Sequence, residues 1–87
     1  MGKYLINTHS TIRKTNGDTF LREGFSKVVS EKVLKLAKQA NKEVGYKYVG
    51  RFKDTQGRYY TKYAYVSEAY SNSEREVTYF VTITKLK

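Results

Sequence analysis

Two turn signals, each containing a glycine, constrain how this chain of 87 residues can fold. The first is Asn16-Gly17, and the second is Asp54-Thr55-Gln56-Gly57. Asn-Gly supplies the two positive-φ residues of a type I′ turn, which is the strongest short-range signal for a β-hairpin. Asp at the first position and Gly at the fourth favour a type I turn closed by a left-handed glycine, which makes a three-residue loop with a bulge. The sequence therefore predicts two hairpins.

The first turn predicts the register of the first hairpin. A two-residue loop pairs Thr15 with Asp18, and that register places Ile12 opposite Leu21. Directly opposite residues share a face of the sheet, as do residues two apart along a strand. The inward face of this hairpin is therefore expected to consist of Ile6, Ile12, Leu21 and Phe25.

The segment from Ser26 to Glu43 predicts one α-helix, because apolar residues recur in it at helical spacing while lysines share another face. Ser26 is a suitable N-cap, Ser30-Glu31 is an alternative start, and Gly45 is a suitable C-terminal stop. Leu34 falls off the main apolar stripe. That stripe consists of Val28, Val29, Val33, Leu36, Ala37 and Ala40.

The second turn leaves two registers open for the strands beside it. If Asp54 pairs with Arg58, a mostly apolar face containing Phe52 and Tyr60 fits beneath the helix. A four-residue loop instead shifts the pairing by one residue and turns one strand over. We prefer the bulged loop, because it places the apolar residues of the later strand inward. The opposite face of the sheet then carries Lys47, Val49, Arg51, Lys53, Tyr59, Thr61, Tyr63 and Tyr65.

A last strand is predicted over about residues 76–86, where apolar residues alternate with threonines and Phe80 falls on the polar side. The order of elements is then ββαβββ. One helix packed on one face of a mainly antiparallel sheet, an α+β two-layer sandwich, is the economical architecture for that order. We expect a single domain over residues 1–87, because a chain of this length holds one core.

The charge of the chain indicates the kind of partner. Its 17 basic and 8 acidic residues give a formal net charge of +9. Between Tyr46 and Tyr65, five cations and one acid interleave with seven aromatic residues. Cations bind phosphates and aromatic rings stack on bases, so this pattern is typical of a nucleic-acid-binding surface. The same residues also suit an ordinary sheet, because tyrosine is a favoured strand residue.

The leading functional hypothesis is a small nucleic-acid-binding module with little sequence specificity. Cations and tyrosines on the sheet face opposite the helix would contact phosphates and bases, and further cations lie near the first turn and on the helix. The sequence leaves DNA or RNA, and single or double strands, open. The candidate residues are Lys47, Arg51, Lys53, Tyr59, Tyr63, Tyr65, Arg13, Lys14, Lys35, Lys38 and Lys42.

A protein partner is the alternative hypothesis. Tyrosine and arginine are also preferred anchors of protein interfaces, and an exposed strand edge can pair with a strand of a partner. The chain would then be a small regulator or inhibitor module that docks on an acidic or nucleic-acid-binding protein.

No catalytic, cofactor or metal site is expected. His9 is the only histidine and cysteine is absent, so a conventional zinc site lacks its ligands. No stretch approaches the roughly 20 apolar residues of a membrane span, and the first residues lack a signal-peptide core. We therefore expect a cytoplasmic protein that is not an enzyme and has no membrane contact.

Overall fold

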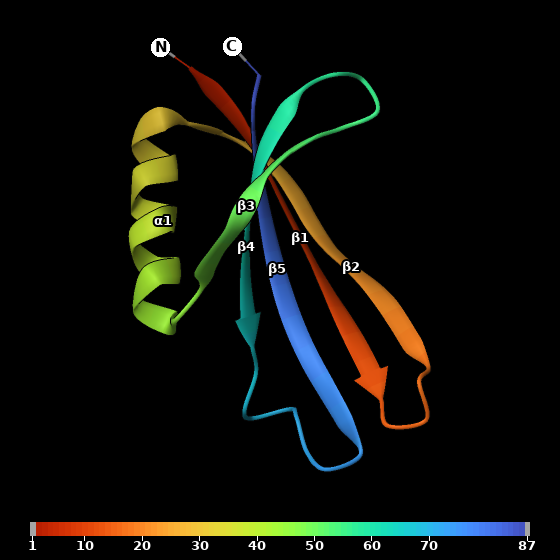
Figure 1. Cartoon of the computed structure of the whole chain (residues 1–87). Helices are drawn as coiled ribbons and strands as arrows, with labels where there is room; N and C mark the ends of the chain where they lie inside the picture. The colour runs from red at the N-terminus through yellow and green to blue at the C-terminus, as the bar shows by residue number, and fades with distance from the viewer. Residues whose placement is uncertain (1, 87) are drawn as a thin grey trace.

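The computed structural model describes residues 2–86 and arranges them as one antiparallel sheet with a helix on one face (Figure 1). The element order and this packing confirm the predicted α+β class. The elements are β1 (Lys3–Lys14), β2 (Thr19–Ser30), α1 (Glu31–Val44), β3 (Lys47–Lys53), β4 (Tyr59–Val66) and β5 (Arg75–Lys85).

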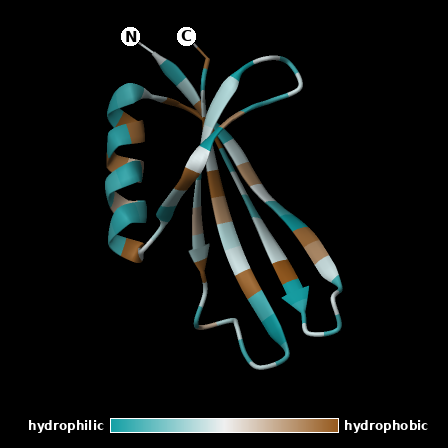
Figure 2. Ribbon diagram, viewed as in Figure 1, coloured by the Kyte–Doolittle hydropathy of each residue, from teal (hydrophilic) through white to brown (hydrophobic). Residues whose placement is uncertain are grey.

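The last strand, β5, lies at the centre of the sheet, whose strand order is β2-β1-β5-β4-β3. It pairs with β1 on one side and with β4 on the other, and so joins the two hairpins. Hydrophobic and polar bands alternate along β5 (Figure 2), and its Val77, Val81 and Ile83 side chains are buried. The predicted alternation of this strand is therefore confirmed.

The core lies between α1 and one half of the sheet. Leu34 of α1 is its anchor, and it clusters with buried aliphatic residues of β1, β2 and β5. In Figure 1, β1, β2 and β5 extend well beyond the helix, so the helix covers only part of the sheet. The buried cluster is Ile6, Val29, Leu34, Val81 and Ile83, with Tyr4, Ala37, Tyr46 and Tyr63 packed around it.

The helix begins at Glu31, so the alternative start is correct and Ser26 is not the N-cap. The Ser30 hydroxyl accepts a hydrogen bond from the Val33 N–H at 3.4 Å. Residues 26–30 instead continue β2, since their pairing with β1 satisfies the backbone and buries Val29.

The buried face of the helix differs from the predicted stripe. Leu34 is 5% exposed, whereas Val33 and Leu36 are 44% and 66% exposed. The predicted stripe included Val28 and Val29, which belong to β2 and not to the helix. A helical stripe drawn through those two residues leaves out Leu34. The face that meets the sheet runs through Leu34, Ala37 and Asn41, which are three and four residues apart.

The first turn is a three-residue loop, not the predicted two-residue loop. The Lys14 N–H donates to the Asp18 carbonyl oxygen at 2.8 Å, which closes the loop around residues 15–17. Gly17 has φ 94°, and no non-glycine residue in the described part of the chain has positive φ. A type I′ turn needs two such residues. The register near the tip is therefore shifted by one, and Ile12 faces Phe20 instead of Leu21.

A β-bulge restores the predicted register at the base of this hairpin. Two residues of β2, Gly24 and Phe25, stand opposite Thr8, whose hydroxyl oxygen accepts a hydrogen bond from the Phe25 N–H at 2.9 Å. A Cβ at Gly24 would collide with that hydroxyl, so the bulge requires glycine. Beyond it, Asn7 pairs with Ser26 as a two-residue loop would have placed them.

The shifted tip and the bulge alter the predicted inward face of the first hairpin. Ile6 is buried and Ile12 is half-buried, as expected. Leu21 and Phe25 are 64% and 61% exposed, so their predicted burial is wrong.

Candidate nucleic-acid interface

The second turn forms as predicted. The Asp54 N–H donates to the Arg58 carbonyl oxygen at 2.9 Å, and Gly57 takes φ 81°. The Asp54 carboxylate accepts hydrogen bonds from the Arg58 and Gln56 N–H groups at 2.9 and 2.8 Å. The hydrogen bond from the Arg58 N–H is the largest cause of a lowered pKa of Asp54, and the bond from Gln56 acts in the same direction. Phe52 faces Tyr60, so the preferred register is confirmed next to the turn.

The two faces of this hairpin are reversed relative to the prediction. Tyr63 pairs with Val81 of β5, whose side chain is buried beneath the helix, so Tyr63 lies on the helix side. Phe52 and Tyr60 lie on the open side of the sheet. The register between β4 and β5 decides this, and the pattern of the hairpin alone does not contain it.

A bulge at Val49 separates Lys47 from the other β3 candidates. Tyr48 pairs with Tyr63, but the next pair is Gly50 with Lys62. Lys47 therefore lies on the open side, and its predicted place beside the other candidates is wrong. The predicted common face holds for Arg51, Lys53, Tyr59, Thr61, Tyr63 and Tyr65, although it is the helix side.

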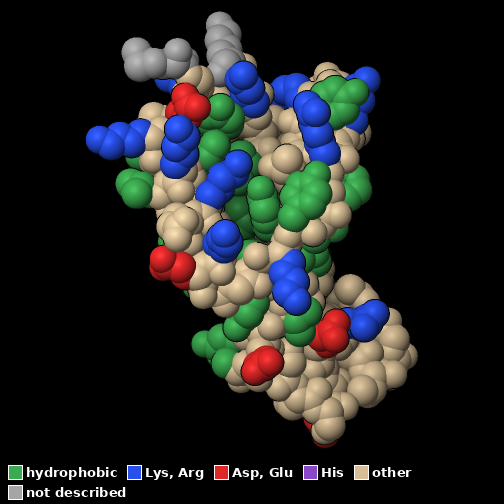
Figure 3. Space-filling view, turned by 60° about the vertical axis from the view of Figure 1, so that its left-hand side comes forward, with side chains coloured by type: hydrophobic (Ala, Val, Ile, Leu, Met, Phe, Trp, Pro, Cys, Tyr) green, Lys and Arg blue, Asp and Glu red, His purple; other side chains and the backbone are tan. Residues whose placement is uncertain are grey.

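A groove lies between α1 and the β3–β4 hairpin, and we call it the helix–hairpin groove. Its volume is about 300 Å³. It stays open because α1 packs mainly against β1 and β2 and leaves the tyrosines of the other hairpin partly accessible. Figure 3 shows basic side chains on both sides of a hollow with a hydrophobic floor. The lining residues are Lys38, Asn41, Lys42, Tyr46, Tyr63 and Ile83.

The β3 cations continue the row that begins at the groove. Arg51 pairs with Thr61, which in turn pairs with Ile83 on the groove floor. The Arg51 guanidinium lies 4.5 Å and the Lys53 ammonium 5.7 Å from the centre of the Tyr59 ring. Both cations are thus held on an aromatic surface by cation–π contacts.

The cations around the groove are not neutralised by carboxylates. Within residues 2–86 the ion pairs are Arg13–Glu76 at 3.4 Å and Arg58–Asp54 at 3.3 Å. Lys38, Lys42, Arg51 and Lys53 take part in neither pair. Their charges are available to an anionic ligand, because no acidic side chain of the described chain competes for them.

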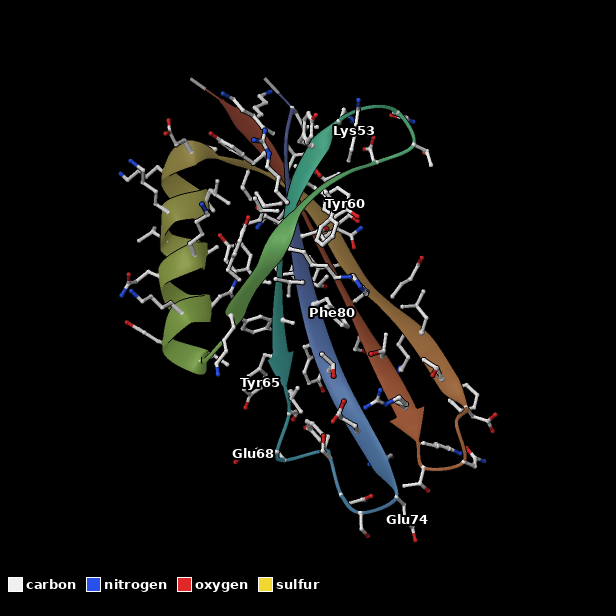
Figure 4. All side chains as sticks on the ribbon, in the orientation of Figure 1. Lys53, Tyr60, Tyr65, Glu68, Glu74 and Phe80 are labelled. Atoms are coloured by element: carbon white, nitrogen blue, oxygen red, sulfur yellow. The ribbon has the colours of Figure 1, made fainter. Side chains whose placement is uncertain are left out.

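The other candidates lie outside the groove. Arg13 is paired with Glu76, and the Lys14 ammonium lies 5.3 Å from the centre of the Phe20 ring. Figure 4 shows Glu68 and Glu74 at the end of the molecule opposite Lys53. The tip of the first hairpin lies at this same end (Figure 1), so acidic residues are near it. Lys35 is exposed on α1 but does not line the groove.

The sequence interpretation missed Tyr46 as a site residue. Its N–H donates to the Asn41 carbonyl oxygen at 3.0 Å, and Gly45 before it has φ 117°. This is a Schellman ending, whose second residue beyond the helix is commonly apolar and packs back on it. Partial burial is the main cause of a raised pKa of Tyr46, and the neighbouring Tyr79 and Tyr65 raise it further. A tyrosine directly after the helix-ending glycine was the available signal.

Phe80 lies on the open side of the sheet, away from the groove. Its ring stacks on His9 with 4.9 Å between ring centres, and the Lys62 ammonium lies 4.4 Å from its centre. Partial burial, with the positive charge of Lys62, lowers the pKa of His9, and Glu23 opposes this change. The open side therefore presents an aromatic stack that is already occupied by its own neighbours, and also the pair Phe52–Tyr60 with 5.8 Å between ring centres.

Residues 2–86 hold no group of three His, Cys, Asp or Glu side chains placed to bind a metal ion. In the same range no helix has the length and apolar character needed to cross a membrane. Comparisons with protein-family models, curated proteins and solved structures found no match.

Proposed function

We propose that this protein binds nucleic acid in the helix–hairpin groove. The supporting observation is the groove itself, where unpaired cations of α1 lie beside a tyrosine floor and the β3 cations extend the same face. Lys38 and Lys42 would contact phosphates from one side, and Arg51 from the other. Tyr63 would meet a base. These contacts recognise phosphate charges and the ring faces of bases, which all sequences share, so we expect little sequence preference.

The number of cations sets the expected salt dependence. Phosphate contacts by the four unpaired cations Lys38, Lys42, Arg51 and Lys53, each contributing about 0.7 to the slope of log affinity against log salt on a single strand, give a slope near −3. Each stacked base would add roughly 1–3 kcal/mol that salt changes little. Binding should therefore weaken steeply but not vanish as salt rises.

The test is fluorescence anisotropy with a labelled 12-nucleotide oligonucleotide over a salt series. Lys38→Glu should weaken binding at low salt and reduce the slope by about 0.7. Lys32→Glu is the matched control, because Lys32 is exposed on the same helix but does not line the groove. Equal losses in both variants would place the binding surface elsewhere, and no binding by the unmodified protein at low salt would refute the function.

A protein partner at the β2 edge is the second candidate function. β2 is a 12-residue edge strand, and all of it except Val29 is exposed. Edge strands can accept a strand of another protein, and exposed apolar patches often mark interfaces. The large apolar residues exposed on this strand are Phe20, Leu21, Phe25 and Val28.

A pull-down from nuclease-treated extract separates the two candidates. A protein that is retained by the unmodified chain and lost with Leu21→Lys would support a protein partner at β2. Retention that is equal in both, or abolished by nuclease, would count against this candidate.

A further inference from the structure

A second hollow lies on the helix side of the sheet, in the part that α1 does not cover, and we call it the arginine bowl. Its volume is about 510 Å³. Tyr46 lines both the bowl and the helix–hairpin groove, so the two hollows meet at this residue. The bowl adds polar and aromatic residues to those of the groove, and three of them, His9, Glu23 and Phe80, belong to a cross-strand row of the open side. The others are Thr8, Ser10, Arg22, Tyr70, Arg75 and Tyr79.

A series of tyrosines connects the groove to the bowl. Tyr46 packs on Tyr65 with 5.5 Å between ring centres. Tyr65 is paired with Tyr79, so their side chains share the helix side of the sheet. Tyr79 lies in the same cross-strand row as Ser10 and Arg22. The aromatic surface therefore continues from the groove to an arginine at the far side of the bowl.

The two arginines of the bowl are available to a ligand. The Arg75 Nε donates a hydrogen bond to the Tyr70 carbonyl oxygen at 3.1 Å, which holds this side chain beside the tyrosine. Neither Arg22 nor Arg75 belongs to an ion pair within residues 2–86. The bowl thus combines cations and tyrosines, as the groove does. It also includes Glu23, which is paired with His9 in the row of the open side.

We propose that the groove and the bowl form one continuous track for a single-stranded polynucleotide, an inference that rests on the nucleic-acid function proposed above. The strand crosses at Tyr46, its bases stack on the tyrosines, and its phosphates contact Lys38 and Lys42 in the groove and Arg22 and Arg75 in the bowl. Unpaired bases expose the ring faces that tyrosines bind, whereas a duplex covers those faces with its own stacking.

The outer face of α1 argues against a duplex as the ligand. A duplex lying along the helix would need a continuous basic surface, but Val33, Leu36 and Val44 are exposed there. The unpaired cations instead border the hollows on the sheet. The track therefore favours a flexible strand that can enter a recess over a rigid helix that lies on a surface.

Binding of oligothymidylates of 3 and 12 nucleotides, and of a 12-base-pair duplex, tests the track. The variant is the double substitution Arg22→Gln/Arg75→Gln. The control is Lys14→Gln/Lys32→Gln, which removes the same charge from residues outside both hollows. Thermal melting followed by circular dichroism establishes that both variants fold.

We expect the unmodified protein to bind the 12-mer more tightly than the 3-mer and the duplex. The arginine variant should reduce the salt slope for the 12-mer by about 1.4, since two phosphate contacts of about 0.7 each are lost. If the arginine variant and the unmodified protein bind the 12-mer equally at 1 M salt, the variant should bind it up to roughly 60-fold more weakly at 50 mM salt. The 3-mer, which fills the groove alone, should be unaffected, and the control should match the unmodified protein.

The outcomes separate this inference from the proposed function. Equal affinity for the two lengths, equal losses in the arginine variant and the control, or preference for the duplex would overturn the track. In each of these cases, sensitivity of binding to Lys38→Glu would still support the groove. No binding of any oligonucleotide by the unmodified protein would overturn the function itself.

Discussion

Truncation of Leu34 to alanine should be the most destabilising single change in the helix. Leu34 is 5% exposed and meets Ile6, Val29, Val81 and Ile83 across the helix–sheet interface. Leucine-to-alanine changes in a core cost about 2–5 kcal/mol, and the value depends on how far the cavity can collapse. The adjacent groove gives this site room to relax, so we expect about 2–3 kcal/mol here.

Such a loss is large for a domain of this size. Small domains are stable by only about 5–15 kcal/mol, and 1 kcal/mol shifts the melting temperature of a 60–100-residue domain by about 4–8 °C. The Leu34→Ala variant should therefore melt roughly 8–24 °C lower, which follows from those two ranges. Urea unfolding followed by circular dichroism would measure the free-energy change, with an unchanged m-value as the sign that only the native packing is affected.

Val33→Ala is the matched control for Leu34→Ala. Val33 is the neighbouring residue and belongs to the stripe predicted from sequence, but it is 44% exposed. We expect its truncation to cost less than about 1 kcal/mol, since much of the side chain is already in water. A larger loss of unfolding free energy for Val33→Ala than for Leu34→Ala would show that the helix packs through the stripe predicted from sequence. The groove beside Lys38 would then be wrongly placed as well.

Further predictions concern the bulge, the open side and the second turn. Gly24→Ala should lower the melting temperature, because the new methyl group meets the hydroxyl and the carbonyl oxygen of Thr8; equal melting of Gly24→Ala and the unmodified protein would refute the bulge. The lowered pKa of His9 means that the unfolded chain takes up the proton more readily, so stability should fall as pH drops below about 6.5, and His9→Gln should flatten that part of the pH profile. The lowered pKa of Asp54 should likewise contribute stability above its ordinary pKa that is lost at more acidic pH, and Asp54→Asn should remove this loss in urea titrations.

The parts of the fold that depend on local signals could be predicted from the sequence. The turn at Asp54–Gly57 formed as expected because a side-chain acceptor and a left-handed glycine specify it within four residues. The alternation of β5 and the helix-ending Gly45 are equally local. These features together predict the element order and the α+β class.

The parts that depend on pairing between distant segments could not be predicted in the same way. The bulges at Gly24–Phe25 and Val49 each move later side chains to the other face, and neither has a distinctive sequence pattern. The side of the sheet on which Tyr63 lies follows from its pairing with Val81, a residue of a later strand.

The same long-range pairing decides the candidate site. Arg51, Tyr59 and Tyr63 share a face as expected, yet that face lies under the helix edge and not on the open side. The helix lysines and the sheet tyrosines, which the sequence presents as separate candidates, therefore border one groove. Their meeting depends on which part of the sheet α1 covers, and no local pattern contains this information.

A titration of ¹⁵N-labelled protein with a 12-nucleotide oligothymidylate, followed by backbone amide NMR shifts, tests the groove most directly. Binding in the groove should shift the amides of Lys38, Asn41, Lys42 and Tyr46 first and leave those of Asn16 and Gly17, which line neither hollow, unchanged. Shifts centred on the Asn16–Gly17 tip or on the β2 edge, with the groove amides unmoved, would contradict the proposed site.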